Sequence, residues 1–186
     1  MVYSLQQILH AFRNWLISES NLAWNETRRN WTPRIKAFFG QLGRRGGFIP
    51  IYTRASPKQS EYLLDLVWKV ESPRRFLELG MESELSGRPS EIMKDFEKLL
   101  DVKANIKVGV FQLNSDTEEK TIEKMQEKLM EQAYHMQTEK YLVIFLRYHP
   151  TRNRGEVEIS GHKLSITGEK EEIERDNYSF PYSSDS

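Results

Sequence analysis

Three of the carboxylates between Tyr62 and Leu85, namely Asp65, Glu82 and Glu84, could act together. Asp65 interrupts an apolar run, and Glu82 and Glu84 follow a second apolar run. An acid in a buried segment needs a partner charge or a metal ion, because an unpaired buried charge is costly. Mg²⁺ prefers oxygen ligands and needs only a few protein carboxylates beside a substrate phosphate. The three acids therefore predict a divalent-metal site, and exposed acids that pair with lysines are the alternative.

Two strands joined by a short turn must position these acids. A turn centred on residues 73–74 sets the register of the hairpin, and side chains alternate between the two faces. The three acids then share one face, and the opposite face is wholly apolar. The expected cross-strand pairs are Asp65–Glu82, Val67–Gly80 and Lys69–Glu78. The expected apolar face consists of Leu64, Leu66, Trp68, Val70, Leu77, Leu79 and Met81.

The other elements follow from hydrophobic periodicity. Apolar residues at helical spacing predict helices over 4–30, 33–42, 90–100 and 117–138. Short apolar runs predict an extended segment at 48–53, strands at 106–113 and 140–149, and a closing hairpin that turns at Gly161 and His162. This order predicts an α/β fold with a mixed central β-sheet flanked by helices. We expect a single domain over 1–168 and an acidic, disordered C-terminal tail over 169–186.

The acids and the order of elements resemble the PD-(D/E)XK nuclease superfamily, which has the restriction-endonuclease-like fold. The likeness consists of Asp65 in one strand, an acid pair at the end of the next, and then helix, strand, helix and strand. It covers roughly residues 20–148 and rests on topology and a degenerate motif. It implies a Mg²⁺-dependent phosphodiesterase that acts on DNA, with Mn²⁺ as an alternative ion. Asp65 and Glu82 would be metal ligands.

The chain departs from the superfamily pattern at Glu84, which stands where the motif usually has a lysine. Some restriction endonucleases of the superfamily look similar, and Glu84 would then be a third metal ligand. In other members a lysine comes from the following helix, where Lys98 is preferred to Lys94. For both lysines a solvated helix face is the alternative. An additional acid from the first helix would be Glu26, with Glu19 behind it, although either acid could pair with nearby arginines on the surface.

The net charge of zero conceals an asymmetry along the chain. Residues 1–60 contain nine Lys and Arg but only two acids. This basic segment could contact phosphates, or it could pair with the acidic remainder of the chain. The expected DNA-binding residues are Arg28, Arg29, Arg44 and Arg45.

Several classes of protein are excluded or disfavoured. The chain has no cysteine, which excludes disulfides and thiolate chemistry, and no apolar run of membrane-spanning length. The four histidines are scattered, so they predict structural or surface roles. We expect a cytoplasmic Mg²⁺-dependent DNA nuclease, with catalysis by Asp65, Glu82, Glu84 and Lys98, no membrane partner, and a homodimer as one assembly. The alternative is a catalytically inactive nucleic-acid-binding or protein-interaction module on the same fold.

Overall fold

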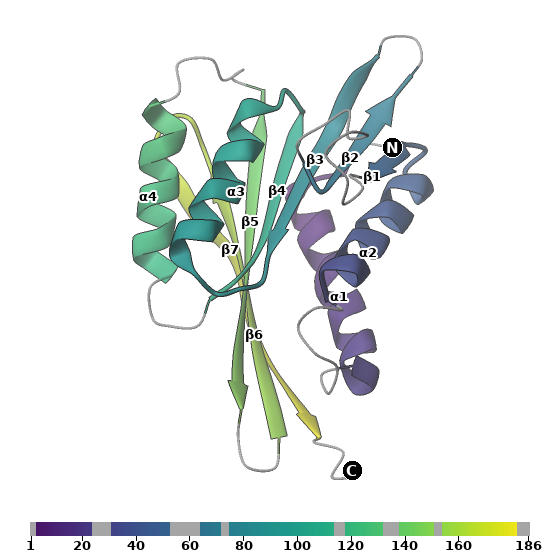
Figure 1. The fold of residues 1–186 in the computed structure, drawn as a ribbon, viewed down its shortest axis with the longest axis vertical. Helices are drawn as coiled ribbons and strands as arrows, with labels where there is room; N and C mark the ends of the chain where they lie inside the picture. The colour runs from purple at the N-terminus through teal and green to yellow at the C-terminus, as the bar shows by residue number, and fades with distance from the viewer. Residues whose placement is uncertain are drawn as a thin grey trace.

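The centre of the molecule is one seven-stranded mixed sheet whose strands lie in sequence order (Figure 1). The computed structural model describes residues 3–23, 31–52, 64–71, 75–113, 118–131, 138–150 and 154–181. Strand β3 pairs with β4 in parallel, and β4 with β5, while all other neighbours are antiparallel. The strands are β1 (Ile49–Tyr52), β2 (Leu66–Val70), β3 (Phe76–Glu84), β4 (Ile106–Gln112), β5 (Lys140–Pro150), β6 (Arg154–Leu164) and β7 (Lys170–Pro181).

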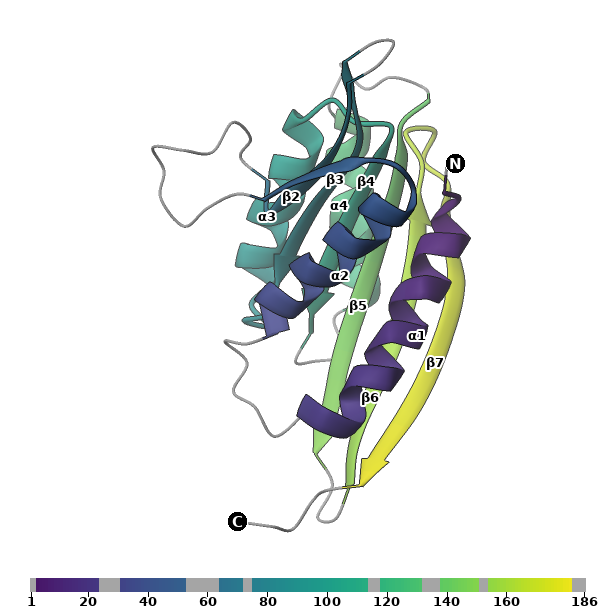
Figure 2. The same cartoon turned by 90° about the vertical axis from the view of Figure 1, so that its right-hand side faces the viewer.

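Helices cover both faces of the sheet, as Figure 2 shows. One face is covered by α1 (Leu5–Ala23) and α2 (Trp31–Arg45), and the other by α3 (Pro89–Asp101) and α4 (Glu118–Glu131). The two parallel strand pairs require crossovers, which α3 and α4 supply. The expected α/β class and the mixed sheet flanked by helices are therefore confirmed.

Two apolar cores form, one on each side of the sheet. Phe12 of α1 and Phe39 of α2 pack with Trp68 in the first core. Phe96 of α3 and Met125 of α4 lie in the second core, together with side chains from β4 and β5. Because β4 and β5 are covered on both faces, their residues are apolar almost without interruption, as is usual for buried parallel strands.

The register of the β2–β3 hairpin agrees with the sequence only in its first half. Val67 pairs with Gly80 as expected, but the register shifts after Trp68. Lys69 consequently pairs with Leu77, so the expected partner Glu78 was wrong. A bulge of this kind adds one residue to one strand, and no periodic pattern reveals it beforehand.

The residues before β2 also differ from the expected face. Strand β2 begins at Leu66, so Asp65 lies just outside the ladder and Leu64 precedes it in a bend. Leu64 packs with Val67 in the core under α3 and α4, not with Leu66 in the opposite core. Strand alternation does not apply to a residue in a bend, which explains the error.

The expected hairpin turn at Gly161 and His162 was wrong, because both residues lie inside the continuous strand β6. Gly161 pairs with Ile144 of β5, and Leu9 of α1 packs directly over it. A Cβ atom at position 161 would collide with the Leu9 side chain. The glycine therefore permits close approach of α1 to the sheet and marks no turn.

The expected disordered tail over 169–186 was also wrong for most of its length. Residues 170–181 form β7, which pairs with β6 along its whole length. Ile173 and Tyr178 pack against the core under α1, and Arg13 of α1 forms ion pairs with Glu174 and Asp176. The acidic composition suggested disorder, but these charges have partners that are distant in the sequence. Residues 182–186 lie outside the described part of the chain.

No helix in the described part of the chain is both long enough and apolar enough to cross a membrane.

Truncation tests the assignment of β7. A chain that ends after Gly168 should lose at least about 2 kcal/mol of unfolding free energy, because Ile173 and Tyr178 no longer pack and the edge of β6 is exposed. A chain that ends after Pro181 keeps β7 and is the matched control. Urea denaturation followed by circular dichroism would measure both. Equal midpoints for the two truncations would mean that β7 contributes nothing to the fold.

Candidate functional site

The acids predicted from the sequence gather at the carboxyl end of β3. Glu82 and Glu84 lie on this last part of the strand, which runs parallel to β4. Asp65 lies beside them, immediately before β2. The carboxyl ends of parallel strands are a common location for ligand sites in open α/β sheets. The sheet therefore brings together the three acids that are separated in the sequence.

Glu82 is the most deeply buried of these acids, with 3% of its surface exposed. Its Oε1 accepts the backbone N–H of Asp65 at 3.0 Å, and its Oε2 lies 3.8 Å from Nζ of Lys98. Burial and then the charge of Asp65 raise the pKa of Glu82 to about 8, although Lys98 acts in the opposite direction. An ionised Glu82 is thus costly unless a further cation approaches it.

Asp65 is held at both carboxylate oxygens. Its Oδ2 accepts the backbone N–H of Ser83 at 3.1 Å and the Ser83 hydroxyl at 2.9 Å. Its Oδ1 lies 2.6 Å from Nζ of Lys36, which comes from α2. These contacts fix the orientation of the carboxylate. Lys36 was not predicted from the sequence, because nothing in the helical pattern of α2 indicates that this residue reaches the hairpin.

Helix α3 contributes Asp95 and Lys98, whose side chains form an ion pair with each other. Burial alone would lower the pKa of Lys98, but the hydrogen bond with Asp95 and the charge of Glu82 raise it above its ordinary value. Lys98 therefore stays protonated beside Glu82. Lys94, the other lysine considered, pairs with Glu91 and is 65% exposed. The structure thus places Lys98, and not Lys94, at the acids.

Asp95 is a fourth carboxylate of the site, and the sequence analysis did not identify it. Its side chain is only 13% exposed. Burial raises the pKa of Asp95 above its ordinary value, although the hydrogen bond with Lys98 opposes the rise. The charges of Glu84 and Asp65 also raise it, which shows that all of these acids share one electrostatic environment. Glu84 itself accepts the backbone N–H of Ser86 at 2.6 Å.

The charges of this group do not balance. Two lysines, Lys36 and Lys98, face four carboxylates, which leaves two negative charges when all are ionised. An oxygen-rich group with this excess fits a hard divalent cation such as Mg²⁺ or Mn²⁺. No three of these carboxylates, all among the described residues, converge within 4.8 Å. Lys36 and Lys98 form ion pairs with these carboxylates instead.

The predicted DNA-binding arginines are not gathered at the acids. Arg44 and Arg45 are the last residues of α2 and lie just before Ile49, the first residue of β1. Ile49 pairs with Lys69, near the end of β2. That end of β2 lies about 13 Å from Asp65, because each strand residue advances the chain by about 3.3 Å. Glu19 pairs with Arg34 at 3.1 Å, as expected for a surface acid. The remaining predicted residues, Glu26, Arg28 and Arg29, lie outside the described residues.

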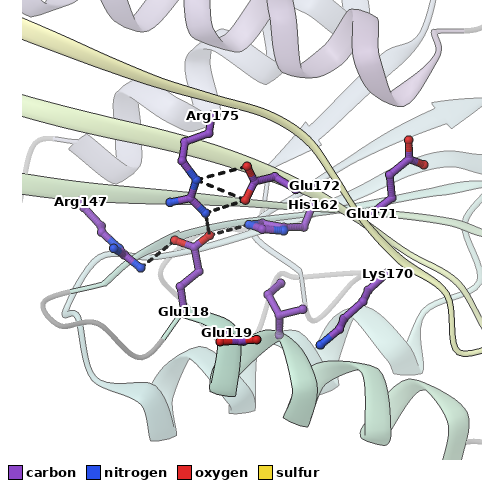
Figure 3. A pocket seen from close by; sticks show the side chains of 9 residues that line it. Glu118, Glu119, Arg147, His162, Lys170, Glu171, Glu172 and Arg175 are labelled. Carbon is purple, nitrogen blue, oxygen red and sulfur yellow. Dashed lines mark hydrogen bonds and ion pairs between the residues drawn. The ribbon is translucent and has the colours of Figure 1, made fainter.

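A second group of ligand-type side chains lies on the other half of the sheet (Figure 3). Glu118 begins α4, His162 lies on β6 and Glu172 lies on β7. One ligand atom of each lies within 4.8 Å of those of the other two, so this group could hold a metal ion. His162 was predicted to have a structural or surface role, because its partners are distant in the sequence and β7 was not expected.

Glu118 is the centre of this second group and is 4% exposed. Its Oε1 accepts hydrogen bonds from His162 Nε2 at 2.6 Å, Ser160 Oγ at 2.8 Å and Arg175 Nη2 at 2.7 Å. Its Oε2 lies 2.9 Å from Nη2 of Arg147. Burial alone would raise the pKa of Glu118, but the hydrogen bonds from His162 and Ser160 outweigh it and lower the pKa to about 2. Glu118 is therefore ionised at neutral pH.

Comparison with known proteins adds no name to either site. No protein-family model matches the chain, and no curated protein matches it.

The raised pKa of Glu82 predicts a specific pH dependence of stability. The neutral carboxyl favours the folded state, so its contribution is fully present below about pH 4.5 and is lost as the pH rises through about 8. Without divalent cations, the wild-type protein should lose about 1–3 kcal/mol of unfolding free energy relative to Glu82→Gln over this range. Urea denaturation at several pH values would measure the difference.

The matched control for this measurement is Glu97→Gln, which removes an exposed carboxylate from the same helix as Lys98. Its stability should follow the wild-type pH profile. A Glu82→Gln profile that runs parallel to the wild-type profile would contradict the raised pKa.

Proposed function

We propose that the protein is a Mg²⁺-dependent nuclease that hydrolyses phosphodiester bonds in DNA, with Mn²⁺ as an alternative ion. The observation that carries this proposal is the buried Glu82 carboxylate, which shares the carboxyl end of β3 with three further acids and only two lysines. Ionising all of these acids together is costly without a further cation, as the raised pKa values of Glu82 and Asp95 indicate. Such an excess of negative charge suits a site that binds a divalent cation and a substrate phosphate.

The arrangement around the site supports a relation to the PD-(D/E)XK superfamily. Asp65 precedes β2, and Glu82 and Glu84 end β3. Helix α3, strand β4, helix α4 and strand β5 then follow in the expected order. This agreement is one of topology and residue type, so we offer the restriction-endonuclease-like fold as part of the proposal.

Asp65, Glu82 and Glu84 would hold the ion. When bound, Mg²⁺ supplies Lewis-acid chemistry, which promotes attack by water and stabilises the leaving oxygen. Ser83 keeps the Asp65 carboxylate oriented through two hydrogen bonds to Oδ2. Lys36 now occupies Oδ1 of Asp65, so we propose that it moves away from this oxygen on metal binding and becomes free to contact a phosphate.

Lys98 would take the role of the missing motif lysine. Its ammonium group stays protonated and lies beside Glu82, so it can stabilise negative charge that develops on the phosphate. Asp95 holds this ammonium group through a direct ion pair. Asp95 is therefore a positioning residue. Because Lys98 supplies the positive charge, Glu84 can act as a metal ligand at the position where the motif usually has a lysine.

A catalytically inactive binding module is the alternative function. The contacts of Lys36 with Asp65 and of Lys98 with Asp95 favour it, because they already neutralise two of the four acids. In that case the acids would stabilise the junction of β2, β3, α2 and α3. The activity would then be binding of nucleic acid or of a protein partner without cleavage.

Cleavage assays with paired variants test the proposal. Plasmid, linear and single-stranded DNA, together with RNA, would be incubated with Mg²⁺ or Mn²⁺. Asp65→Asn and Glu82→Gln should each lower cleavage by more than about 100-fold, which exceeds the usual contribution of residues that only support metal ligands. Lys98→Ala should lower it by about 100- to 1,000-fold, as expected for the loss of one charge-stabilising donor.

Lys94→Ala is the matched control for Lys98→Ala, because it removes an exposed lysine from the same helix. It should cleave like the wild-type protein. Cleavage that persists in both Asp65→Asn and Glu82→Gln would contradict a metal site at these residues. Salt-dependent DNA binding without any cleavage would instead support the inactive module.

A further inference from the structure

The guanidinium group of Arg175 lies between the carboxylates of the second group, at the position that a bound cation would take. Its Nη2 lies 2.7 Å from Oε1 of Glu118 and 2.6 Å from Oε2 of Glu172, so one nitrogen bridges the two carboxylates (Figure 3). His162 Nε2 lies 2.6 Å from the same oxygen of Glu118. The guanidinium group therefore marks a position that one imidazole and two carboxylates surround.

The Arg175 guanidinium group is partly exposed, although it is paired with Glu118, Glu158 and Glu172. Arg175 lies on the edge strand β7, and its side chain is 37% exposed. A pocket of about 440 Å³ opens beside it, lined by Lys170 and Glu171 among others. Glu172, the third ligand-type side chain, is half-exposed on the same strand. Displacing the Arg175 head into the pocket or into solvent would break its three ion pairs, and a bound cation would take over two of them, with Glu118 and Glu172.

The charges of the group also favour such an exchange. Three carboxylates, Glu118, Glu158 and Glu172, face the two guanidinium groups of Arg147 and Arg175, which leaves one negative charge when His162 is neutral. A divalent cation in place of Arg175 would balance the three carboxylates together with the remaining arginine. The buried centre of the group would then carry no net charge, which burial favours.

We propose that Glu118, His162 and Glu172 form a binding site for a divalent cation of the Zn²⁺ class, which takes the place of the Arg175 guanidinium group. One imidazole nitrogen and two carboxylate oxygens are ligands that Zn²⁺ accepts, whereas Mg²⁺ prefers oxygen alone. Arg147 holds Oε2 of Glu118 and so directs Oε1 towards His162. Support of this kind from residues behind the ligands orients them at many metal sites.

The cation would join three elements that are far apart in the sequence. Glu118 is the first residue of α4, and the other two ligands lie on β6 and β7. Binding should therefore stabilise the attachment of α4 and the edge strand to the sheet. This site shares no residue with the acids around Glu82, so the proposal is independent of the nuclease function.

Isothermal titration with Zn²⁺ on the full chain tests the site. The wild-type protein should bind at this group with an affinity that falls by more than about 10-fold in Glu172→Gln and in His162→Ala, since even supporting residues contribute about 10- to 100-fold. Arg175→Gln should bind more tightly, because it removes the competing guanidinium group. Glu171→Gln is the matched control, since it changes the neighbouring exposed acid of β7, and it should bind like the wild-type protein.

Co²⁺ absorbance would show whether the histidine is a ligand, because His162→Ala should change the spectrum of bound Co²⁺. Glu172→Gln keeps the test valid if the buried His162→Ala variant does not fold, since Glu172 is half-exposed. The proposal is overturned if neither the wild-type protein nor Arg175→Gln binds Zn²⁺. It is equally overturned if Glu172→Gln and Glu171→Gln bind with the same affinity as the wild-type protein.

Discussion

The burial of the Glu82 carboxylate is the interaction on which the proposed active site depends. Glu82 lies where β3 is covered by α3, so water cannot solvate its charge. Among the described residues, Lys98 and the backbone N–H of Asp65 approach its two oxygens, and the charge of Asp65 works against ionisation. The fold therefore holds a carboxylate that gains from a nearby cation, and this is the condition that a metal site requires.

The helix layers on the two faces of the sheet each contribute charged side chains to the site. Lys36 comes from α2 and contacts Asp65, whereas Asp95 and Lys98 come from α3 on the other face of the sheet. Both layers must be packed before the acids acquire these partners. The site is thus a property of the assembled fold, and the β2–β3 hairpin alone would present only mutually repelling carboxylates.

Local patterns predicted much of this arrangement. Alternation in the hairpin was sufficient to place Glu82 and Glu84 on one face and to pair Val67 with Gly80. Helical spacing predicted the helix that became α3, and the resemblance to the nuclease superfamily, not the spacing, pointed to Lys98 on it. Such patterns predict contacts between residues that are close in the sequence or lie opposite each other in one hairpin. They were therefore sufficient for the acids of the hairpin and for the position of the following helix.

Contacts between distant segments could not be predicted in the same way. Lys36 reaches Asp65 from another helix, and Glu118 meets His162 and Glu172 across three elements. Gly161 was predicted to be a turn residue because glycine is common in turns, whereas here it makes room for Leu9 of α1. The acidic segment of β7 resembled a tail because its neutralising partner Arg13 lies at the opposite end of the chain.

The central claim is that the acids around Glu82 bind a divalent cation, and anomalous diffraction from crystals grown with Mn²⁺ tests it most directly. The account predicts an anomalous peak bounded by Asp65, Glu82 and Glu84, with the Lys36 ammonium group displaced from Asp65. A structure in which Lys36 stays on Asp65, with no anomalous peak there at saturating Mn²⁺, would contradict it.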